Sequence, residues 1–487
     1  MARNKLDETA IEQRNLVDGR WVEAESGETF EVRDPATDDV IARVPNCGRG
    51  ETRWAIEAAA RAYEAWRARP AFERSRMLRA IADMMLRDEK RLAHLMTLEQ
   101  GKPLAEARAE VAYAASFIEW AAEEGKRIYG EMVPASLPDK RILVLRQPIG
   151  VTACITPWNF PIAMITRKLG PALAAGNTMV VKPAEETPLS ALAFGELAIE
   201  AGIPEGVINI VTGDPEEIGE ELLANSTVRK LSFTGSTETG KVLIRKSAQN
   251  VTRLSLELGG HAPFLVFDDA DVDAAVAGAL ASKYRNMGQT CICANRFYIQ
   301  DGIYDAFAER LSAAVARMQA GRGTDEGVEV GPLITDAAME KVERHVADAV
   351  ARGGRVRQGG TRVRVDGLAD RFYAPTVIDD FSPEMLLAQE ETFGPVAPLR
   401  RFSSEADAIS MANDSIYGLA AYFYTRDAGR LMRVAERLEY GIVGANDGKP
   451  STAQAPFGGV KQSGYGREGG RYVMDEYTQV KYLSWQL

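Results

Sequence analysis

The stretch "TMVVKPAEETPLSALAFGELAIEAGIPEGVINIVTGDPEE", residues 178–217, decides the fold class of this chain. Within it, the short apolar run "TMVVKP" precedes a segment with several leucines on one helical face. "GVINIV" then precedes a helix that starts near Pro215. Strands that alternate with helices of this length indicate βαβ units. We therefore predict a parallel sheet with helices on both faces.

The same alternation continues downstream. "RKLSF" precedes a helix that starts near Ser236, and the strand-like "APFLVF" precedes the helical "DVDAAVAGALASKY". Further strand–helix units continue to about Gly444, whereas the N-terminal third is rich in helical pattern. The chain is thus predicted to be an α/β protein, and its 487 residues allow two or three domains.

The composition narrows the classes of function. A net charge of −11 argues against a nucleic-acid partner. The N-terminus, "MARNKLDETAIEQRN", lacks the apolar core of a signal peptide, and the charge-free run at residues 149–166 contains two prolines. We read that run as a buried strand followed by a loop, not as a membrane span. Four cysteines in so long a chain indicate a reducing compartment, so a cytoplasmic protein without disulfides is expected.

Two segments alternate like exposed β-strands: the tail "DEYTQVKYLSWQL" and "RILVLRQPIG", residues 141–150. An exposed strand edge favours pairing with another chain. Together they predict an oligomerisation arm, and hence a homodimer or homotetramer.

Two strand ends are possible nucleotide sites. In "KLSFTGSTETGK", residues 230–241, a β run leads into Gly235 and Ser236, which open a helix whose free N–H groups suit a phosphate. An ordinary helix cap explains this stretch equally well. "VVKPAEETP" is the second strand end, and ligands of open α/β sheets bind at such ends. The G-x-G-x-x-G match at Gly464 follows no strand, and reads as a loop that shapes another surface.

The stretch "GQTCICANR", residues 288–296, holds Cys291 and Cys293. A metal site is disfavoured because the chain has three histidines and no second cysteine pair nearby, and a disulfide between residues i and i+2 is strained. Buried packing is the usual fate of a free cysteine. The residues alone leave packing and a nucleophile as interpretations of Cys291.

Seven stretches in order resemble the aldehyde dehydrogenase superfamily, over nearly the whole chain. They are "ITPWNFP" at Ile155, "GNTMVVKPAEETP" at Gly176, "FTGSTETG" at Phe233, "LELGG" at Leu256, "GQTC" at Gly288, "EETFGPV" at Glu390 and "PFGGVKQSG" at Pro456. The resemblance implies a Rossmann-like cofactor domain, an α/β catalytic domain and a β oligomerisation arm. It places the NAD-binding domain at residues 1–127 and 148–256, the catalytic domain at 257–458, and the arm and C-terminal tail at 128–147 and 459–487.

The resemblance assigns the chemistry to three residues. Cys291 matches the thiol that attacks the aldehyde carbon. The side-chain amide of Asn159 and the backbone N–H of Cys291 match the donors that stabilise the hemithioacetal oxygen. Hydride transfer to the nicotinamide leaves a thioester, and Glu257 matches the general base for its hydrolysis. Taken alone, Glu257 could be a solvated residue at a strand end, and Asn159 a turn former.

The resemblance also indicates the cofactor. In this family the lysine of "VVKP" reaches the adenosine ribose, so Lys182 takes that role. Three residues later, Glu185 can accept a hydrogen bond from a free 2′-hydroxyl and would repel a 2′-phosphate, which predicts NAD over NADP. The other residues assigned to the cofactor shell are Trp158, Gly235, Ser236, Leu258, Glu391 and Phe393.

"NFPIAMITRK" and "SKYRNMGQTCICANR" resemble the succinate-semialdehyde dehydrogenases in particular. Arg167, Arg285 and Ser451 match positions that hold the substrate's distal carboxylate, which a guanidinium binds bidentately. For an arbitrary arginine, a structural ion pair is the more usual role. The resemblance implies NAD(P)-dependent oxidation of succinate semialdehyde to succinate.

Alternatives remain. Lys449 and His261 depart from the subgroup, and an extra cation near the pocket would favour a longer or more oxidised substrate, glutarate or 2-oxoglutarate semialdehyde. One alternative function is that of a CoA-acylating enzyme, and the presence of Glu257 disfavours it. Another is that of a non-enzymatic relative, and the presence of Cys291 disfavours it. Cys293 could form a reversible disulfide with Cys291 if the loop bends, although plain packing is the simpler role.

Overall fold

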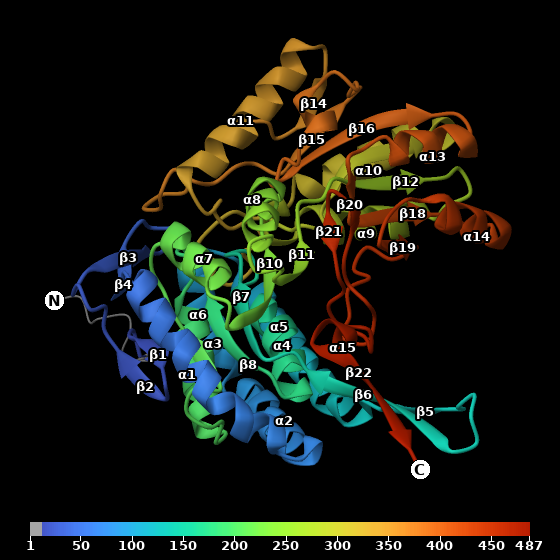
Figure 1. Ribbon diagram of the computed structural model, residues 1–487. Coiled ribbons are helices and arrows are strands. Elements are labelled where there is room, and N and C mark those ends of the chain that lie inside the picture. Colours follow the sequence, from blue (N-terminus) through green and yellow to red (C-terminus); the bar gives the residue numbers. More distant parts are fainter. Residues whose placement is uncertain (1–11) are drawn as a thin grey trace.

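The computed structural model describes residues 12–487, and Figure 1 shows two α/β bodies from which a β ribbon projects. The predicted α/β class is therefore confirmed. The first eleven residues of the predicted range 1–127 lie outside the described part of the chain.

The first body is built on an eight-stranded sheet with the order β2-β1-β9-β8-β7-β10-β11-β21. Its central strands, β9 to β11 in that order, are parallel, and the pairings beyond them are antiparallel. The chain adds β8 and β9 on one side of β7 and then β10 and β11 on the other, as in a Rossmann-like sheet. The strands are β1 (Asn15–Val17), β2 (Arg20–Val22), β7 (Val151–Ile155), β8 (Thr178–Lys182), β9 (Ile208–Ile210), β10 (Val228–Thr234), β11 (Arg253–Glu257) and β21 (Gly464–Tyr465).

Helices cover both faces of this sheet because its strands are apolar on both sides. In β8, Val181 joins one hydrophobic cluster while the adjacent Val180 joins another. Successive side chains of a strand point to opposite faces, so a fully buried strand needs cover on each. The first cluster is formed with α2 (Ala71–Arg87), α3 (Glu89–Gln100), α4 (Leu104–Glu124), α5 (Pro161–Ala175) and α6 (Leu189–Glu200), and the second with α1 (Arg49–Ala68), α7 (Pro215–Ala224) and α8 (Thr237–Ser247).

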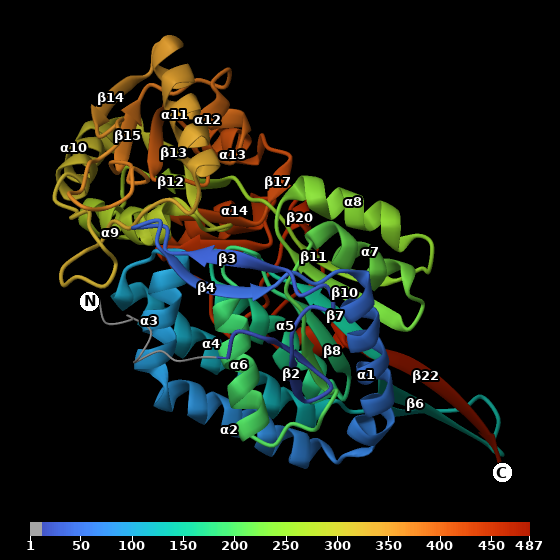
Figure 2. The same cartoon turned by 90° about the vertical axis from the view of Figure 1, so that its left-hand side faces the viewer.

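The helical pattern of the N-terminal third corresponds to α1 to α4. The strands before α1 were not predicted. Two of them, β3 (Thr29–Arg33) and β4 (Val40–Pro45), form a separate ribbon that crosses the first body in Figure 2.

The second body contains a seven-stranded sheet with the order β14-β15-β16-β13-β12-β18-β19, parallel except at the β14 edge. Phe264 and Val266 join one hydrophobic cluster and Leu265 another, so this sheet is also covered on both faces. The strands are β12 (Ala262–Val266), β13 (Ala294–Gln300), β14 (Arg355–Gln358), β15 (Thr376–Asp379), β16 (Val396–Phe402), β18 (Ala420–Tyr424) and β19 (Ile442–Ala445). The helices are α9 (Val272–Lys283), α10 (Tyr304–Val315), α11 (Asp336–Ala351), α12 (Leu386–Gln389), α13 (Glu405–Asn413) and α14 (Ala428–Arg437), and β17 (Tyr417–Gly418) pairs with β20 (Val460–Lys461).

The projecting ribbon is an antiparallel sheet with the order β22-β6-β5 (Figure 2). It combines β6 (Lys140–Pro148) and β22 (Thr478–Gln486), which correspond to the two segments with an exposed alternating pattern, with a third strand, β5 (Glu131–Val133), that lies outside them. The tail therefore pairs with β6 of its own chain, and its other edge is open. Val480, Tyr482 and Trp485 are exposed on β22.

The tail serves two sheets. Before it reaches the ribbon through α15 (Val473–Glu476), its glycine-rich stretch forms β21, which pairs with the end of β11. The G-x-G-x-x-G match is thus a structural edge of the first sheet, in keeping with the prediction that it is not a nucleotide loop.

The apolar run at residues 149–166 comprises β7, a loop and the first turns of α5, as predicted for its first part. In the described part of the chain, no helix combines the length and apolar character that crossing a membrane requires.

Candidate active site

The predicted site residues gather at the carboxyl edge of the first sheet, where it faces the second body. β7, β8, β10 and β11 are mutually parallel, so the loops that follow them open on the same side. Those loops carry Asn159, Lys182, Ser236 and Glu257 at or just beyond the strand ends. This is the edge at which open α/β sheets bind their ligands.

Cys291 lies in the loop between η2 (Arg285–Gly288) and β13. The residue is only 8% exposed, and its backbone carbonyl lies so close to Gly260 that a Cβ atom there would collide with it. The second glycine of "LELGG" therefore allows the two loops to touch. Burial, followed by the nearby Glu257 carboxyl, raises the pKa of the Cys291 thiol well above its usual value of 9.0.

Glu257 is the last residue of β11 and is 3% exposed. Neither carboxyl oxygen has a hydrogen-bond partner among residues 12–487. Burial raises its pKa to about 7, while Arg167 and, more weakly, the nearby Cys291 thiol oppose the shift. A carboxyl group that titrates near neutral pH beside a thiol can take a proton from that thiol or from a water molecule.

Asn159 lies in the loop between β7 and α5, and its side chain points toward the nucleophile loop. Its Nδ2 donates a hydrogen bond to the carbonyl of Gln289 at 3.0 Å, two residues before Cys291. An amide group has two N–H donors, so one stays available. The side chain is 3% exposed, and its Oδ1 has no partner within the described chain. Asn159 and Cys291 are therefore brought together as predicted.

A cavity of about 920 Å³ opens in front of Cys291. Arg167, Arg285 and Ser451 also line it, together with apolar side chains such as Phe160 and Phe457. Its walls come from α4 and α5 of the first body and from α9 and α10 of the second, so the cavity lies between the two bodies.

The two arginines of the cavity keep free donors. Arg167 forms an ion pair with Glu468 at 2.8 Å and lies over the ring of Phe457, at 3.8 Å. Its Nη2 nevertheless has no hydrogen-bond partner in the described chain, and neither has Nε of Arg285. Unpaired buried guanidinium nitrogens are costly unless a ligand supplies an acceptor. Arg167 thus fills both roles considered for it: a structural ion pair and a cavity-lining cation.

Three further residues of this site were not predicted from the sequence. Tyr113 of α4 hydrogen-bonds Ser451, and Phe457 stacks on Arg167. Glu468, from the glycine-rich tail, also contacts Lys168, beside Arg167 in α5. Phe457 stands in the quoted "PFGGVKQSG", where a stacking role could have been suspected. Tyr113 and Glu468 are distant in sequence and carried no signal.

The two residues that depart from the succinate-semialdehyde dehydrogenase pattern, Lys449 and His261, differ in charge. Lys449 lines the cavity; desolvation raises the pKa of the half-buried Glu106 there, and Lys449 is among the cations that oppose this shift. His261 is fully buried, and desolvation lowers its pKa well below 6.5. The imidazole is therefore neutral at pH 7, so the extra cation that was expected comes from Lys449 alone.

The residues assigned to the adenosine end of a cofactor lie at two strand ends. Lys182, at the end of β8, donates to the carbonyl of Pro183 at 3.1 Å and forms an ion pair with Glu185. Ser236 caps α8 by accepting a hydrogen bond from the backbone N–H of Thr239 at 3.1 Å. The cap interpretation of this stretch is therefore correct, and it leaves the remaining N–H groups of the first turn free for an anion.

The residues assigned to the nicotinamide end lie close to the catalytic group. Glu391 accepts from the backbone N–H of Gly260 at 3.1 Å, and burial raises its pKa to about 7. Phe393 packs edge-on against Trp158 with ring centroids 5.6 Å apart, while Leu258 is buried directly after Glu257. Aromatic faces, a carboxylate and free helix N–H groups fit the ring, ribose and phosphates of a dinucleotide.

Cys293 is buried, and its sulfur contacts Lys283, the last residue of α9. Its sulfur accepts a hydrogen bond from Nζ of Lys283 at 3.3 Å, and Lys283 also donates to Asn295 at 2.9 Å. All four cysteines are free and buried. These contacts favour the packing interpretation of Cys293. Within residues 12–487, no cluster of His, Cys, Asp and Glu could hold a metal ion.

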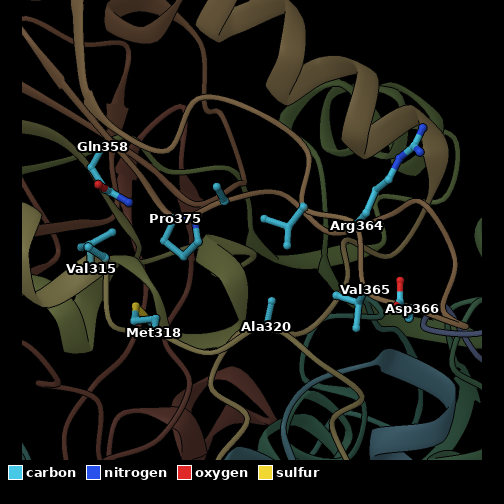
Figure 3. A pocket seen from close by; sticks show the side chains of 11 residues that line it. Val315, Met318, Ala320, Gln358, Arg364, Val365, Asp366 and Pro375 are labelled. Carbon is cyan, nitrogen blue, oxygen red and sulfur yellow. The ribbon is translucent and has the colours of Figure 1, made fainter.

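A smaller cavity of about 490 Å³ lies in the second body, between the end of α10 and the loop before β15 (Figure 3). Val315, Met318 and Pro375 form much of its wall, and Arg364 and Asp366 stand at one side (Figure 3). It contains none of the predicted site residues, so the larger cavity is the candidate active site.

Comparisons with known proteins agree with this geometry. The sequence model described as "Aldehyde dehydrogenase family" matches residues 21–483. The chain is 57% identical over 477 residues both to a glutarate-semialdehyde dehydrogenase of Pseudomonas aeruginosa and to an Escherichia coli K12 succinate-semialdehyde dehydrogenase named for NADP(+), each match covering 98% of both chains. The crystal structure of succinate-semialdehyde dehydrogenase from Burkholderia pseudomallei is similar with a TM-score of 0.96 and 55% identity, covering 98% of each chain.

Proposed function

Since this chain belongs to the aldehyde dehydrogenase family, we propose that it oxidises succinate semialdehyde to succinate with a nicotinamide dinucleotide. The observation that carries the proposal is the single cavity that holds Cys291 together with Arg167 and Arg285. A short substrate with an aldehyde at one end and a carboxylate at the other would meet a thiol and two guanidinium groups at once. Relatives that are 57% identical and named for such semialdehydes support the same substrate class.

The proposed mechanism begins with a proton transfer. The Cys291 thiol gives up its proton to water in the cavity as the sulfur attacks the aldehyde carbon, and the carbonyl oxygen becomes an oxyanion. The free N–H of Asn159 and the backbone N–H of Cys291 donate hydrogen bonds to that oxygen. Fixed donors of this kind are worth on the order of 10²–10³ in rate.

The second half of the reaction releases the acid. A nicotinamide dinucleotide bound beside Glu391 and Phe393 supplies the hydride acceptor. The acyl group is then joined to Cys291 as a thioester. Glu257 takes a proton from the attacking water and passes it to the sulfur as the C–S bond breaks, which restores the thiol, and the acid leaves after losing its own proton to solvent. The hydrolytic role of Glu257 favours water over CoA as the acyl acceptor.

We further propose a preference for NAD over NADP. Glu185 lies beside Lys182 at the end of β8, and its carboxylate would repel a 2′-phosphate. The Escherichia coli relative, which is 57% identical, is named for NADP(+), so NADP is the alternative cofactor. The ion pair weakens the repulsion between Glu185 and a 2′-phosphate, because Lys182 offsets part of the charge of Glu185.

Replacement of Glu185 by serine tests the cofactor preference. The change removes the carboxylate and keeps Lys182 as an unpaired cation, so the ratio of kcat/KM for NADP to that for NAD is expected to rise by about tenfold or more. Steady-state kinetics with both cofactors measure the ratio, and Glu186→Ser, next in sequence, is the matched control. A ratio that stays unchanged in Glu185→Ser would contradict the assignment.

Glutarate semialdehyde is the second candidate substrate. The cavity of about 920 Å³ has room for a longer chain, and Lys449 adds a cation to its wall. The relative named for glutarate semialdehyde is as similar as the one named for succinate semialdehyde. The same argument extends to 2-oxoglutarate semialdehyde, which carries an additional polar group.

A substrate panel separates these candidates. We expect the four-carbon semialdehyde to give the highest kcat/KM among C3 to C6 semialdehydes. Neutral aldehydes of equal length should be slower by on the order of 10²–10⁴-fold, because they lose the charge-assisted hydrogen bonds to the two arginines. A maximum at five carbons would transfer the assignment to glutarate semialdehyde. Equal rates for neutral and acidic aldehydes would contradict the proposed substrate class.

The exposed ribbon supports assembly into a homodimer or homotetramer. Its apolar side chains and the open edge of β22 give a second chain both a surface and a strand with which to pair. An acidic composition and four free cysteines support work in a reducing compartment such as the cytoplasm.

A further inference from the structure

A buried lysine stands behind the loop that carries Asn159. Lys102, in the turn between α3 and α4, is fully buried at its side chain, and its Nζ donates to the backbone carbonyl of Asn159 at 2.8 Å. The same Nζ forms an ion pair with Glu110 of α4 and lies 4.1 Å from the ring centroid of Phe160. A charge at this depth is costly unless several groups compensate it, and three do so here.

Glu110 fixes the other side of the same loop. Its Oε1 accepts a hydrogen bond from the backbone N–H of Ala163, in the first turn of α5, at 3.2 Å. The N-cap residue of α5, Phe160, provides no side-chain hydrogen bond of its own. The carboxylate of Glu110 therefore satisfies an N–H group that would otherwise lack a partner at the buried start of the helix. The pair Lys102–Glu110 thus holds residues 159–163 at both ends.

The loop that precedes the nucleophile is tied to the same point. Nδ2 of Asn286 donates to the Asn159 carbonyl at 3.0 Å, so this one oxygen accepts from Lys102 and from Asn286. Asn286 has a left-handed backbone with φ of 48°, which is uncommon for a residue other than glycine. Two hydrogen bonds hold it in place. Nε2 of Gln100 donates to Oδ1 of Asn286 at 3.0 Å, and the carboxylate of Glu106 accepts from the backbone N–H of Asn286 at 2.8 Å.

We propose that Lys102, with Glu110, is a positioning residue for the oxyanion-binding amide of Asn159. The inference rests on the proposed function, in which Asn159 and Cys291 share a tetrahedral intermediate. The backbone carbonyl that Lys102 holds belongs to the residue whose side chain must aim an N–H at the oxyanion. Because Asn286 holds the same carbonyl from the nucleophile loop, the contact also sets the distance between the two loops.

The expected effect is on the chemical step. Removing Lys102 frees the Asn159 carbonyl from its charged donor and leaves Glu110 buried without its cation. A displacement of about 1 Å in a catalytic group costs up to about 10²-fold in rate, so a 10- to 100-fold loss of kcat is expected for Lys102→Met. KM for NAD should be unchanged within about twofold, because Lys102 lies outside the proposed cofactor shell.

Two readouts distinguish positioning from general damage. Hydrolysis of p-nitrophenyl acetate without cofactor passes through an oxyanion on the substrate, and should fall in parallel with kcat. Alkylation of Cys291 by iodoacetamide forms no such oxyanion, and its rate should stay within about threefold of the parent enzyme. A merely structural role would lower both rates together.

A double-mutant cycle supplies the decisive test. In an Asn159→Ala background, Lys102→Met should lower kcat by less than about threefold, since the group that it positions is already gone. If Lys102→Met does not fold, Lys102→Met/Glu110→Leu removes both charges, a replacement that buried ion pairs often tolerate. Asp379→Asn is the matched control: Asp379 is a buried carboxylate paired with Arg357 outside the cavity, and its replacement should leave kcat unchanged.

Three results would overturn the inference: an unchanged kcat in Lys102→Met, a full 10- to 100-fold loss that persists in the Asn159→Ala background, or a parallel loss of alkylation. A failure of the proposed function looks different. In that case Asn159→Ala itself leaves kcat unchanged, whatever Lys102→Met does.

Discussion

Replacing Cys291 by alanine is expected to lower aldehyde oxidation by on the order of 10⁴-fold or more, because the covalent route to the acid is lost. The residue is 8% exposed and the change removes a single sulfur atom, so the fold and dinucleotide binding should persist. The measurement is the rate of NADH formation at saturating substrate, with tryptophan fluorescence quenching by NAD as the check on binding.

Cys293→Ala is the matched control for this prediction, since both thiols are buried and lie two residues apart. The sulfur of Cys293 accepts a hydrogen bond from Lys283 in the interior, so its loss should affect stability more than turnover. The same variant tests the disulfide alternative. Reversible inactivation by peroxide that requires Cys293 would revive the switch, whereas identical inactivation in both enzymes would exclude it. Turnover that survives in Cys291→Ala would contradict the nucleophile assignment.

Replacing Glu257 by glutamine should stop the reaction after the first hydride transfer. The amide cannot accept a proton from the attacking water, and general bases contribute about 10²–10⁴-fold to such steps. We expect a burst of NADH equal to the concentration of active sites, followed by steady turnover slower by that factor. Rapid-mixing absorbance at the NADH wavelength records both phases. A variant that keeps the steady rate of the parent enzyme would contradict the role of Glu257.

The same residue sets the expected pH dependence. Burial raises the pKa of Glu257 to about 7, so its base form is depleted as the pH falls through that value. In the parent enzyme the rate of thioester hydrolysis should therefore drop by about tenfold per pH unit below about 6 and level off above about 8. Glu257→Gln should lose this dependence.

Local patterns were enough to predict the fold class. The alternation of buried runs with helices predicted the parallel sheet, because strands such as "TMVVK" are apolar on both faces and can only sit between two helical layers. The two alternating segments at residues 141–150 and near the C-terminus do meet in one ribbon. In the site, the resemblance to the aldehyde dehydrogenase superfamily assigned Cys291 and Glu257 to one reaction, and the structure brings the two side chains together.

Long-range pairings account for what the sequence did not reveal. Glu468 reaches Arg167 from the far end of the chain, and Lys102 reaches the Asn159 carbonyl from 57 residues earlier in the sequence. A buried ion pair has no periodicity and no fixed spacing, so neither contact leaves a local pattern. The neutral state of His261 likewise depends on its burial between elements distant in sequence.

The central claim is that Cys291 carries the acyl group during turnover. Glu257→Gln enzyme mixed with succinate semialdehyde and NAD, quenched in acid and analysed by mass spectrometry, tests it most directly. We predict a succinyl adduct on the peptide that contains Cys291, in near-stoichiometric amount, and its absence when NAD is omitted. An adduct on another residue, or none while NADH is still formed, would contradict the account.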